Sequence, residues 1–109
     1  MVKVTHLVLA LCVAVAAGPA LADDAKQPEI LLGMSTALTG PASDLGREMR
    51  LGVVAGLERA NRAGGVNGFH LRLITLDDGY EPTRTAPNMR ELLETDKVLA
   101  VIGNVGTTF

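Results

Sequence analysis

The sequence contains few residues of the types that cross-link a chain or bind metal ions. Its single cysteine, Cys12, lies in the apolar run of residues 7–17, so the rest of the chain has no thiol and no disulfide framework. There is no tryptophan, and the two histidines, His6 and His70, stand far apart. Because metal sites need clustered histidine, cysteine or carboxylate ligands, we expect neither a metal nor a cofactor.

An excess of positive charge is also missing. Ten lysines and arginines face twelve aspartates and glutamates, which gives a net charge of −2. A nucleic-acid-binding domain carries a basic patch or stripe, so we expect no nucleic-acid partner.

The signatures of common enzymes are incomplete. Residues 33–37 (GMSTA) approach the G-x-S-x-G elbow around Ser35, but the last glycine is absent and a helix begins only about eight residues later. No G-x-G-x-x-G opens the first helix. The acidic side chains of Asp77, Asp78 and Glu81 match no calcium loop, so we assign them to turn formation and helix capping. We therefore expect no enzyme.

The first 22 residues have the layout of a secretory signal peptide. Lys3 precedes the apolar run of residues 7–17, and Ala20 and Ala22 frame an A-x-A cleavage site. The run is too short to span a bilayer as a helix. Leu11 stands before Cys12 where a lipoprotein site has a small residue. We predict cleavage after Ala22, export to the periplasm, and a polar leader over residues 23–29.

The remaining sequence alternates strands and helices. Apolar runs predict strands over residues 30–35, 70–76 and 98–102, with one helix that carries the apolar positions of residues 45–60 and ends at residues 63–68, and a second over residues 83–96. Ser43 or Asp44 is expected to cap the first helix, and Pro87 to kink or delay the second. Short loops and right-handed crossovers predict a three-layer α/β fold, a βαβαβ parallel sheet of order 2-1-3.

The first predicted helix has an apolar stripe and a charged face. The stripe recurs at helical spacing, and Gly52 and Gly56 beside it predict close approach to the sheet. Glu58 and Arg62 are spaced to form an ion pair. The glycine-rich residues 63–68 (AGGVNG) are expected to end the helix in left-handed conformations. The stripe consists of Leu45, Met49, Val53, Leu57 and Ala60.

The third predicted strand leads into a glycine-rich turn that bears hydroxyl groups. Residues 98–102 show no polar alternation, which predicts a strand covered on both faces. Gly103 and Gly106 let backbone N–H groups approach a ligand, and Thr107 and Thr108 add two hydroxyls. Ligands of open α/β sheets bind beyond the carboxyl ends of the strands. We expect this turn and residues 78–81 to lie at the same end of the sheet.

Four segments in this order carry a resemblance to a known family. They are residues 34–41 (MSTALTGP), 61–68 (NRAGGVNG), 77–82 (DDGYEP) and 101–108 (VIGNVGTT). Together with the exported leader, they resemble the N-terminal lobe of leucine/isoleucine/valine-type periplasmic binding proteins, the solute receptors of ABC importers. The resemblance covers residues 30–109 and implies a type I periplasmic binding fold, in which two lobes close on a small solute such as an amino acid.

The resemblance also implies roles for individual residues. Thr107 would hold the solute carboxylate with its hydroxyl and N–H, with backbone groups of Val105 and Gly106 beside it and Thr108 assisting. Leu45 occupies the position that packs on the solute side chain. Tyr80 could be a ligand platform or a loop-packing aromatic. Some members join the second and third loops by a disulfide; the matching positions here are Tyr80 and Gly106, so that bond is absent.

The resemblance extends to partners and to length. It implies an ABC permease as the partner of the full-length protein, and its two-lobed members are longer. We therefore expect this chain to be a fragment or truncated reading frame, with a genuine small domain as the alternative. The identity of the solute stays open.

Two alternative functions stay open, and each has an observation that would distinguish it from the importer component. A sensory ectodomain would be followed by a transmembrane helix and a kinase. An α/β enzyme would lose its activity on Ser35→Ala.

Overall fold

The structure is a computed structural model that describes residues 27–106. The predicted signal peptide, Thr107 and Thr108 lie outside the described residues. The elements in chain order are β1 (Glu29–Thr36), α1 (Ser43–Arg62), β2 (His70–Asp77), α2 (Pro82–Arg90), the π-helical turn η1 (Glu91–Thr95) and β3 (Ala100–Val101). Among the described residues, no helix is both long and apolar enough to cross a membrane.

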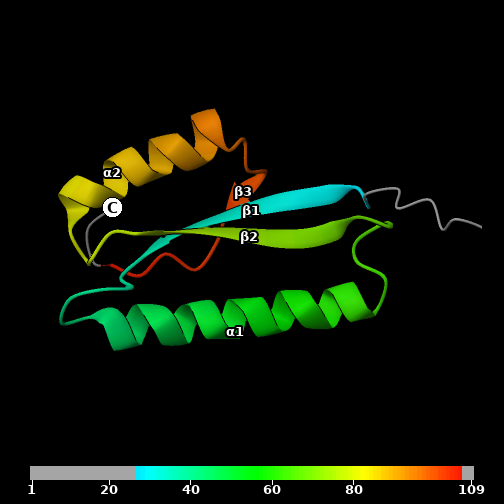
Figure 1. Cartoon of the computed structure of the whole chain (residues 1–109), viewed down its shortest axis with the longest axis horizontal. Helices are drawn as coiled ribbons and strands as arrows, with labels where there is room; N and C mark the ends of the chain where they lie inside the picture. Colours follow the sequence, from blue (N-terminus) through cyan, green and yellow to red (C-terminus); the bar gives the residue numbers. More distant parts are fainter. Residues whose placement is uncertain (1–26, 107–109) are drawn as a thin grey trace, which may run out of the picture.

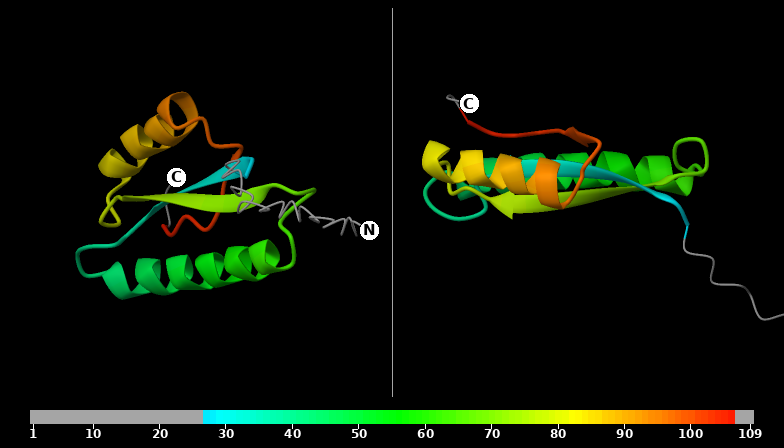
Figure 2. Two further views of the ribbon diagram at one scale, coloured as in Figure 1. Left: turned by 45° about the vertical axis from the view of Figure 1, so that its right-hand side comes forward. Right: turned by 90° about the horizontal axis from the view of Figure 1, so that it is seen from above.

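The three strands form a parallel sheet in the order β2-β1-β3. β1 pairs with β2 from Glu29↔His70 to Thr36↔Asp77, and with β3 at Leu32↔Ala100. Helix α1 covers one face of the sheet, whereas α2 and η1 cover the other (Figures 1 and 2). The predicted α/β class, layer arrangement and strand order are confirmed. β1 and β2 each extend beyond the predicted bounds, by one residue at both ends of β1 and at the carboxyl end of β2.

The core lies on both sides of β1: Leu92 and Val98 meet the position of Gly33 on the η1 side, whereas Met34 lies beside Gly103 and Val53 on the α1 side. Met34, Ala37, Leu92 and Val98 are its buried apolar side chains. A Cβ at Gly33 would lie 3.0 Å from a methyl carbon of Leu92, so the absence of a side chain lets η1 pack directly on β1. β1 is therefore the strand around which both layers are built.

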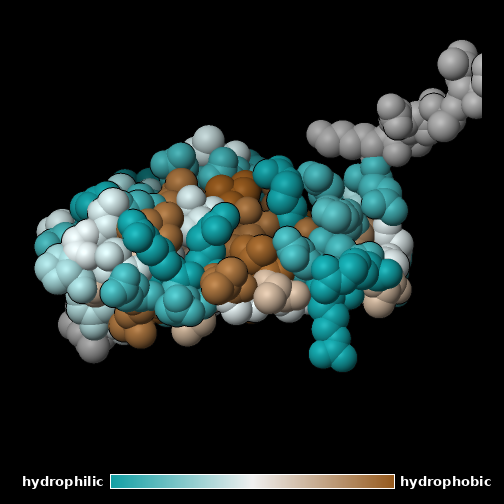
Figure 3. Space-filling view, turned by 60° about the horizontal axis from the view of Figure 1, so that its bottom comes forward, coloured by the Kyte–Doolittle hydropathy of each residue, from teal (hydrophilic) through white to brown (hydrophobic). Residues whose placement is uncertain are grey.

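Helix α1 approaches the first loop at a glycine other than those predicted. A Cβ at Gly46 would lie 1.9 Å from the carbonyl oxygen of Ala37, whereas one at Gly52 or Gly56 would meet no described atom within 4 Å beyond its chain neighbours and the nearby backbone of α1. The prediction for Gly52 and Gly56 is wrong because both face away from the sheet. On the side that carries α1, apolar side chains stay exposed among hydrophilic ones (Figure 3); Leu45 and Met49 are 56% and 41% exposed.

Both helix starts differ from the prediction. α1 begins at Ser43 with Ala42 as its N-cap, and neither Ser43 nor Asp44 makes a capping hydrogen bond. The backbone supplies the first contact instead, because Ser43 N donates to Gly40 O in the preceding turn. α2 begins at Pro82 and continues through Pro87. The missing N–H of a proline costs one backbone bond, but the delay expected at Pro87 does not occur, because α2 already begins at Pro82.

The third strand is shorter and more exposed than predicted. β3 spans Ala100–Val101, and Leu99 and Ile102 are 75% and 43% exposed. The expectation of cover on both faces is wrong for the described residues, because Leu99, Ala100 and Ile102 are exposed and only Val98 is buried. Leu93 is also exposed, whereas Leu92 of the same turn is buried.

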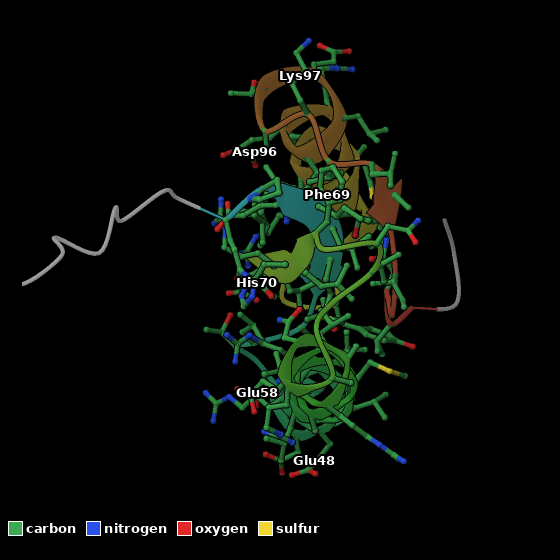
Figure 4. The ribbon with its side chains drawn as sticks, turned by 90° about the vertical axis from the view of Figure 1, so that its right-hand side faces the viewer. Glu48, Glu58, Phe69, His70, Asp96 and Lys97 are labelled. Atoms are coloured by element: carbon green, nitrogen blue, oxygen red, sulfur yellow. The ribbon has the colours of Figure 1, made fainter. Side chains whose placement is uncertain are left out.

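The opposite, amino-terminal end of the sheet carries the glycine-rich turn. Gly64, Gly65 and Gly68 have positive φ angles, as predicted for this turn. Asn61 bonds Leu71 twice, through N–H···Oδ1 and Nδ2–H···O contacts of 2.8 Å each, and so satisfies backbone groups of the edge strand β2. Figure 4 looks onto this end: His70 lies there at the start of β2, Glu48 points away from the sheet, and Glu58 lies at the side of α1. His70 is thus the exposed strand-entry residue predicted, and the Glu58–Arg62 pair forms at 3.9 Å.

Candidate functional site at the carboxyl edge of the sheet

The carboxyl ends of the three strands meet at one edge. β1 ends at Thr36, β2 at Asp77 and β3 at Val101, and the strands are parallel. Helices α1 and α2 begin at the same edge, and the N-terminus of a helix carries partial positive charge. The prediction that residues 78–81 and the turn after β3 lie at the same end is confirmed.

A buried hydrogen-bond network centred on Ser35 joins the segments at this edge. The Ser35 hydroxyl donates to Asp78 Oδ2 at 2.8 Å and accepts from Asn88 Nδ2 at 3.2 Å. Ser35 N donates to Asn104 Oδ1 at 3.0 Å, and Thr85 Oγ1 donates to Asp78 Oδ2 at 3.1 Å. Ser35 and Asp78 are fully buried. The interpretation of Ser35 as a nucleophile has no support here, since its hydroxyl is bonded to a carboxylate inside the protein.

Asp77 holds the loop that follows β1. Its Oδ1 accepts from the N–H groups of Leu38 (2.8 Å), Thr39 (3.3 Å) and Gly79 (2.9 Å), and its Oδ2 accepts from Thr39 Oγ1 (2.6 Å) and Arg84 Nη2 (3.3 Å). The Thr39 hydroxyl, followed by these backbone N–H groups, holds the pKa of Asp77 well below its usual range. Because one carboxylate bonds both loops, the first loop is tied to the second at a defined position.

The acidic residues after β2 act as turn formers. Tyr80 N donates to Asp78 Oδ1 at 2.9 Å, and Gly79 N donates to Asp77. The predicted helix capping is wrong, because Glu81 is the N-cap of α2 and makes no capping bond with its side chain. Among the described residues, no group of three histidine, cysteine, aspartate or glutamate side chains could hold a metal ion.

The predicted ligand-binding residues that the structure describes follow or flank this edge. Leu45 lies in the first turn of α1 and is exposed. Tyr80 has a φ of +69° and is 38% exposed, with its backbone in the turn after β2. Val105 is half-buried and Gly106 exposed, in the segment after β3. Thr107 and Thr108 lie outside the described residues.

A groove of about 670 Å³ runs between α2 and the segment after β3. Apolar side chains dominate its walls, and Asn104 and Thr85 contribute polar atoms to it. Leu45, Tyr80, Val105 and Gly106 do not line it. A second groove, of about 450 Å³, lies between α1 and β2 and includes His70, away from the carboxyl edge. Neither groove coincides with the predicted solute-binding residues.

Sequence reasoning missed the residues that hold the edge together. Asn88 and Asn104 both bond Ser35, and Thr85 bonds Asp78. The available signal was the position of Ser35 and Asp78 at the ends of adjacent strands, since polar side chains at such positions meet. No spacing rule pointed to Asn88, because its partner lies 53 residues earlier in the chain.

Comparisons with known proteins agree on one family. A family model described as a periplasmic binding protein matches residues 29–109. An amino acid binding protein of Pseudomonas aeruginosa is 32% identical over 70% of this chain and 20% of its own length.

Two solved structures are similar to the described fold. A possible leucine/isoleucine/valine-binding protein from Rhodopirellula baltica is 52% identical, with a TM-score of 0.71 over 74% of this chain and 22% of its own. A branched-chain amino acid transporter substrate binding protein from Streptococcus pneumoniae, in complex with isoleucine, is 25% identical, with a TM-score of 0.66 over 69% of this chain and 22% of its own. The chain thus spans about a fifth of the length of these proteins.

Proposed function

Because this chain belongs to the periplasmic binding protein family, we propose that it is part of the exported solute-binding component of an ABC importer. Its relatives include substrate-binding proteins of branched-chain amino acid transporters. Residues 30–109 would form the N-terminal part of one lobe, with a second lobe closing on the solute. The proposed solute is an amino acid or a similarly small polar molecule.

The observation that carries this proposal is the carboxyl edge of the sheet. Three loops meet there: the side chain of Asp77 bonds the first loop to the second, and Ser35 bonds Asp78 through its hydroxyl and Asn104 through its backbone N–H. A binding site benefits from loops that are ordered before the solute arrives, because less conformational entropy is lost on binding. The network therefore supports a preorganised binding surface at this edge.

The solute head group would bind at the segment after β3. We propose that backbone groups of Val105 and Gly106 and the hydroxyl and N–H of Thr107 hold its carboxylate, with Thr108 assisting. Gly106 is exposed and has no side chain to shield its N–H. A charge-assisted bond of this kind contributes about 1.5–3 kcal/mol.

The solute side chain would contact the other two loops. Leu45 is largely exposed at the start of α1, and Tyr80 is partly exposed in the turn after β2. An exposed leucine and tyrosine at the site edge suit an apolar side chain, since burial of apolar surface contributes roughly 25 cal/mol per Å². Tyr80 serves as a ligand platform in this proposal.

The proposed location of the protein rests on its first 22 residues. Residues 1–22 would direct export and be removed after Ala22, which leaves the receptor in the periplasm. An ABC permease would receive the loaded receptor there. The proposal is therefore an importer component rather than an enzyme.

Titration calorimetry on the full-length protein tests the proposal. L-Isoleucine, L-leucine, L-alanine and L-threonine form the first panel, and saturable binding of at least one is expected. Thr107→Val keeps the side-chain shape and removes the hydroxyl, so it should weaken binding about ten- to a hundred-fold. Unchanged affinity would mean that Thr107 does not anchor the solute.

A further inference from the structure

The backbone pairing of β3 with β1 ends before the solute-binding segment begins. Ile102 N donates to Gly33 O at 2.9 Å, and the chain then turns at Gly103, whose φ is +73°. In a parallel pair, alternate residues of a strand face the same neighbour, so Ser35 carries the next N–H of β1 on the β3 side. That N–H is buried, and an unpaired buried donor costs about 1–3 kcal/mol.

The side chain of Asn104 supplies the missing acceptor. Its Oδ1 accepts from Ser35 N at 3.0 Å, in place of the backbone carbonyl that a longer β3 would offer. Its Nδ2 lies 3.4 Å from Met89 Sδ, a weak acceptor on α2. The Ser35 bond is therefore the stronger of the two contacts that orient the carboxamide.

Through Ser35, Asn104 is connected to the other loops of the site. The Ser35 hydroxyl bonds Asp78, whose second oxygen accepts from Tyr80 N. The segment after β3 and the turn after β2 are thus joined through one buried residue of the central strand. Asn104 directly precedes Val105 and Gly106, so the direction of its carboxamide constrains where these two backbones lie.

We propose that Asn104 is a positioning residue of the solute site: its bond to Ser35 N holds residues 103–106 at the carboxyl edge of the sheet. The inference rests on the proposed function for the solute, but the placement of the segment does not depend on it. Asn104 itself need not touch the solute.

The test compares Asn104→Ala with Asn61→Ala in the full-length protein. Both variants remove one asparagine whose Oδ1 accepts from a backbone N–H of the sheet, but Asn61 bonds Leu71 at the opposite, amino-terminal end of the sheet, away from the segment after β3. Urea unfolding measures the stability that each variant loses, so that their affinities are compared at known stability. The first readout is amide hydrogen exchange at Ser35 and Gly106 without solute, and the second is affinity for L-isoleucine.

Asn104→Ala should speed exchange at Ser35 and Gly106 and weaken L-isoleucine binding about tenfold, which is the loss of one typical hydrogen bond. Asn61→Ala should leave Gly106 exchange and affinity within about twofold. Equal loss of affinity in both variants, or undisturbed exchange at Ser35 in Asn104→Ala, would overturn the assignment.

The experiment distinguishes failure of the proposed solute from failure of the role proposed for Asn104. If the unsubstituted protein does not bind L-isoleucine, the proposed solute fails, while exchange at Ser35 and Gly106 still decides whether Asn104 places the segment. If Asn104→Ala does not fold, Asn104→Asp replaces it, because aspartate keeps the accepting oxygen and loses the contact to Met89. Ser35 should then stay protected, and loss of that protection would contradict the proposal.

Discussion

Replacing Asp77 by asparagine should destabilise the protein by about 2 kcal/mol. The substitution keeps the size of the side chain and one carbonyl oxygen, which can still accept from Leu38, Thr39 and Gly79 N. The other oxygen becomes an NH₂ group that faces the guanidinium of Arg84. Both groups are hydrogen-bond donors, so the bond between them is lost. Asp77 thus loses its charge and one bonding partner.

The magnitude follows from the hydrogen bonds. Bonds to a charged acceptor contribute about 1.5–3 kcal/mol each and neutral ones about 0.5–1.5. In the ion pair, Arg84 is about half exposed and Asp77 about a quarter, so the pair contributes at most about 1 kcal/mol. The N–H bonds persist in weaker form, and the Thr39 hydroxyl can rotate to accept from the new amide. The net loss of about 2 kcal/mol lowers the folding equilibrium constant by up to about 30-fold.

The effect should depend on pH in one direction. The pKa of Asp77 is lower in the folded protein than its unfolded value of about 3.9. Its stabilisation is therefore fully present above about pH 5 and is lost as the pH falls below the unfolded value toward the folded one. The difference between the unsubstituted protein and Asp77→Asn should shrink over that acid range.

Urea unfolding of the full-length protein at pH 7 and at stepwise lower pH measures both quantities. Glu48→Gln is the matched control, because it removes one negative charge from an exposed position on α1 and should change stability by less than about 0.5 kcal/mol. A difference for Asp77→Asn that is equally small, or that stays constant down to pH 3, would refute the role given to this carboxylate.

Two further predictions concern the helix packing and the leader. Gly46→Ala should destabilise the protein by about 1–3 kcal/mol, because its Cβ would clash with Ala37 O; Gly52→Ala on the same helix should be neutral or stabilising by up to about 1 kcal/mol. Equal effects in thermal unfolding would contradict the packing. Mass spectrometry of the exported protein should find Asp23 at its N-terminus, and retention of residues 1–22 would show that the assigned cleavage is wrong.

The strand order and the edge that carries the site could be predicted from the sequence. Short connections and continuous apolar runs leave few topologies for a chain that alternates strands and helices, and the parallel order 2-1-3 is the simplest. The left-handed turn at Gly64 and Gly65 was also readable, because glycine adopts positive φ without steric cost.

What could not be predicted depended on contacts between distant residues. The clash that selects Gly46 over Gly52 arises from a carbonyl in the preceding loop, which no helical periodicity reveals. The exposure of Leu99 depends on what lies beside β3, and the bond from Ser35 to Asn104 spans 69 residues. Local patterns report which residues form an element, but the partners of a polar side chain follow from tertiary packing.

A crystal structure of the full-length protein with its bound amino acid tests the central claim most directly. The proposed function predicts that the solute carboxylate lies at the carboxyl edge of the sheet, within about 3.2 Å of Thr107 Oγ1 and of a backbone N–H in residues 105–107. A solute seated instead in the groove between α1 and β2, or in the groove between α2 and β3 without contact to Thr107, would contradict it.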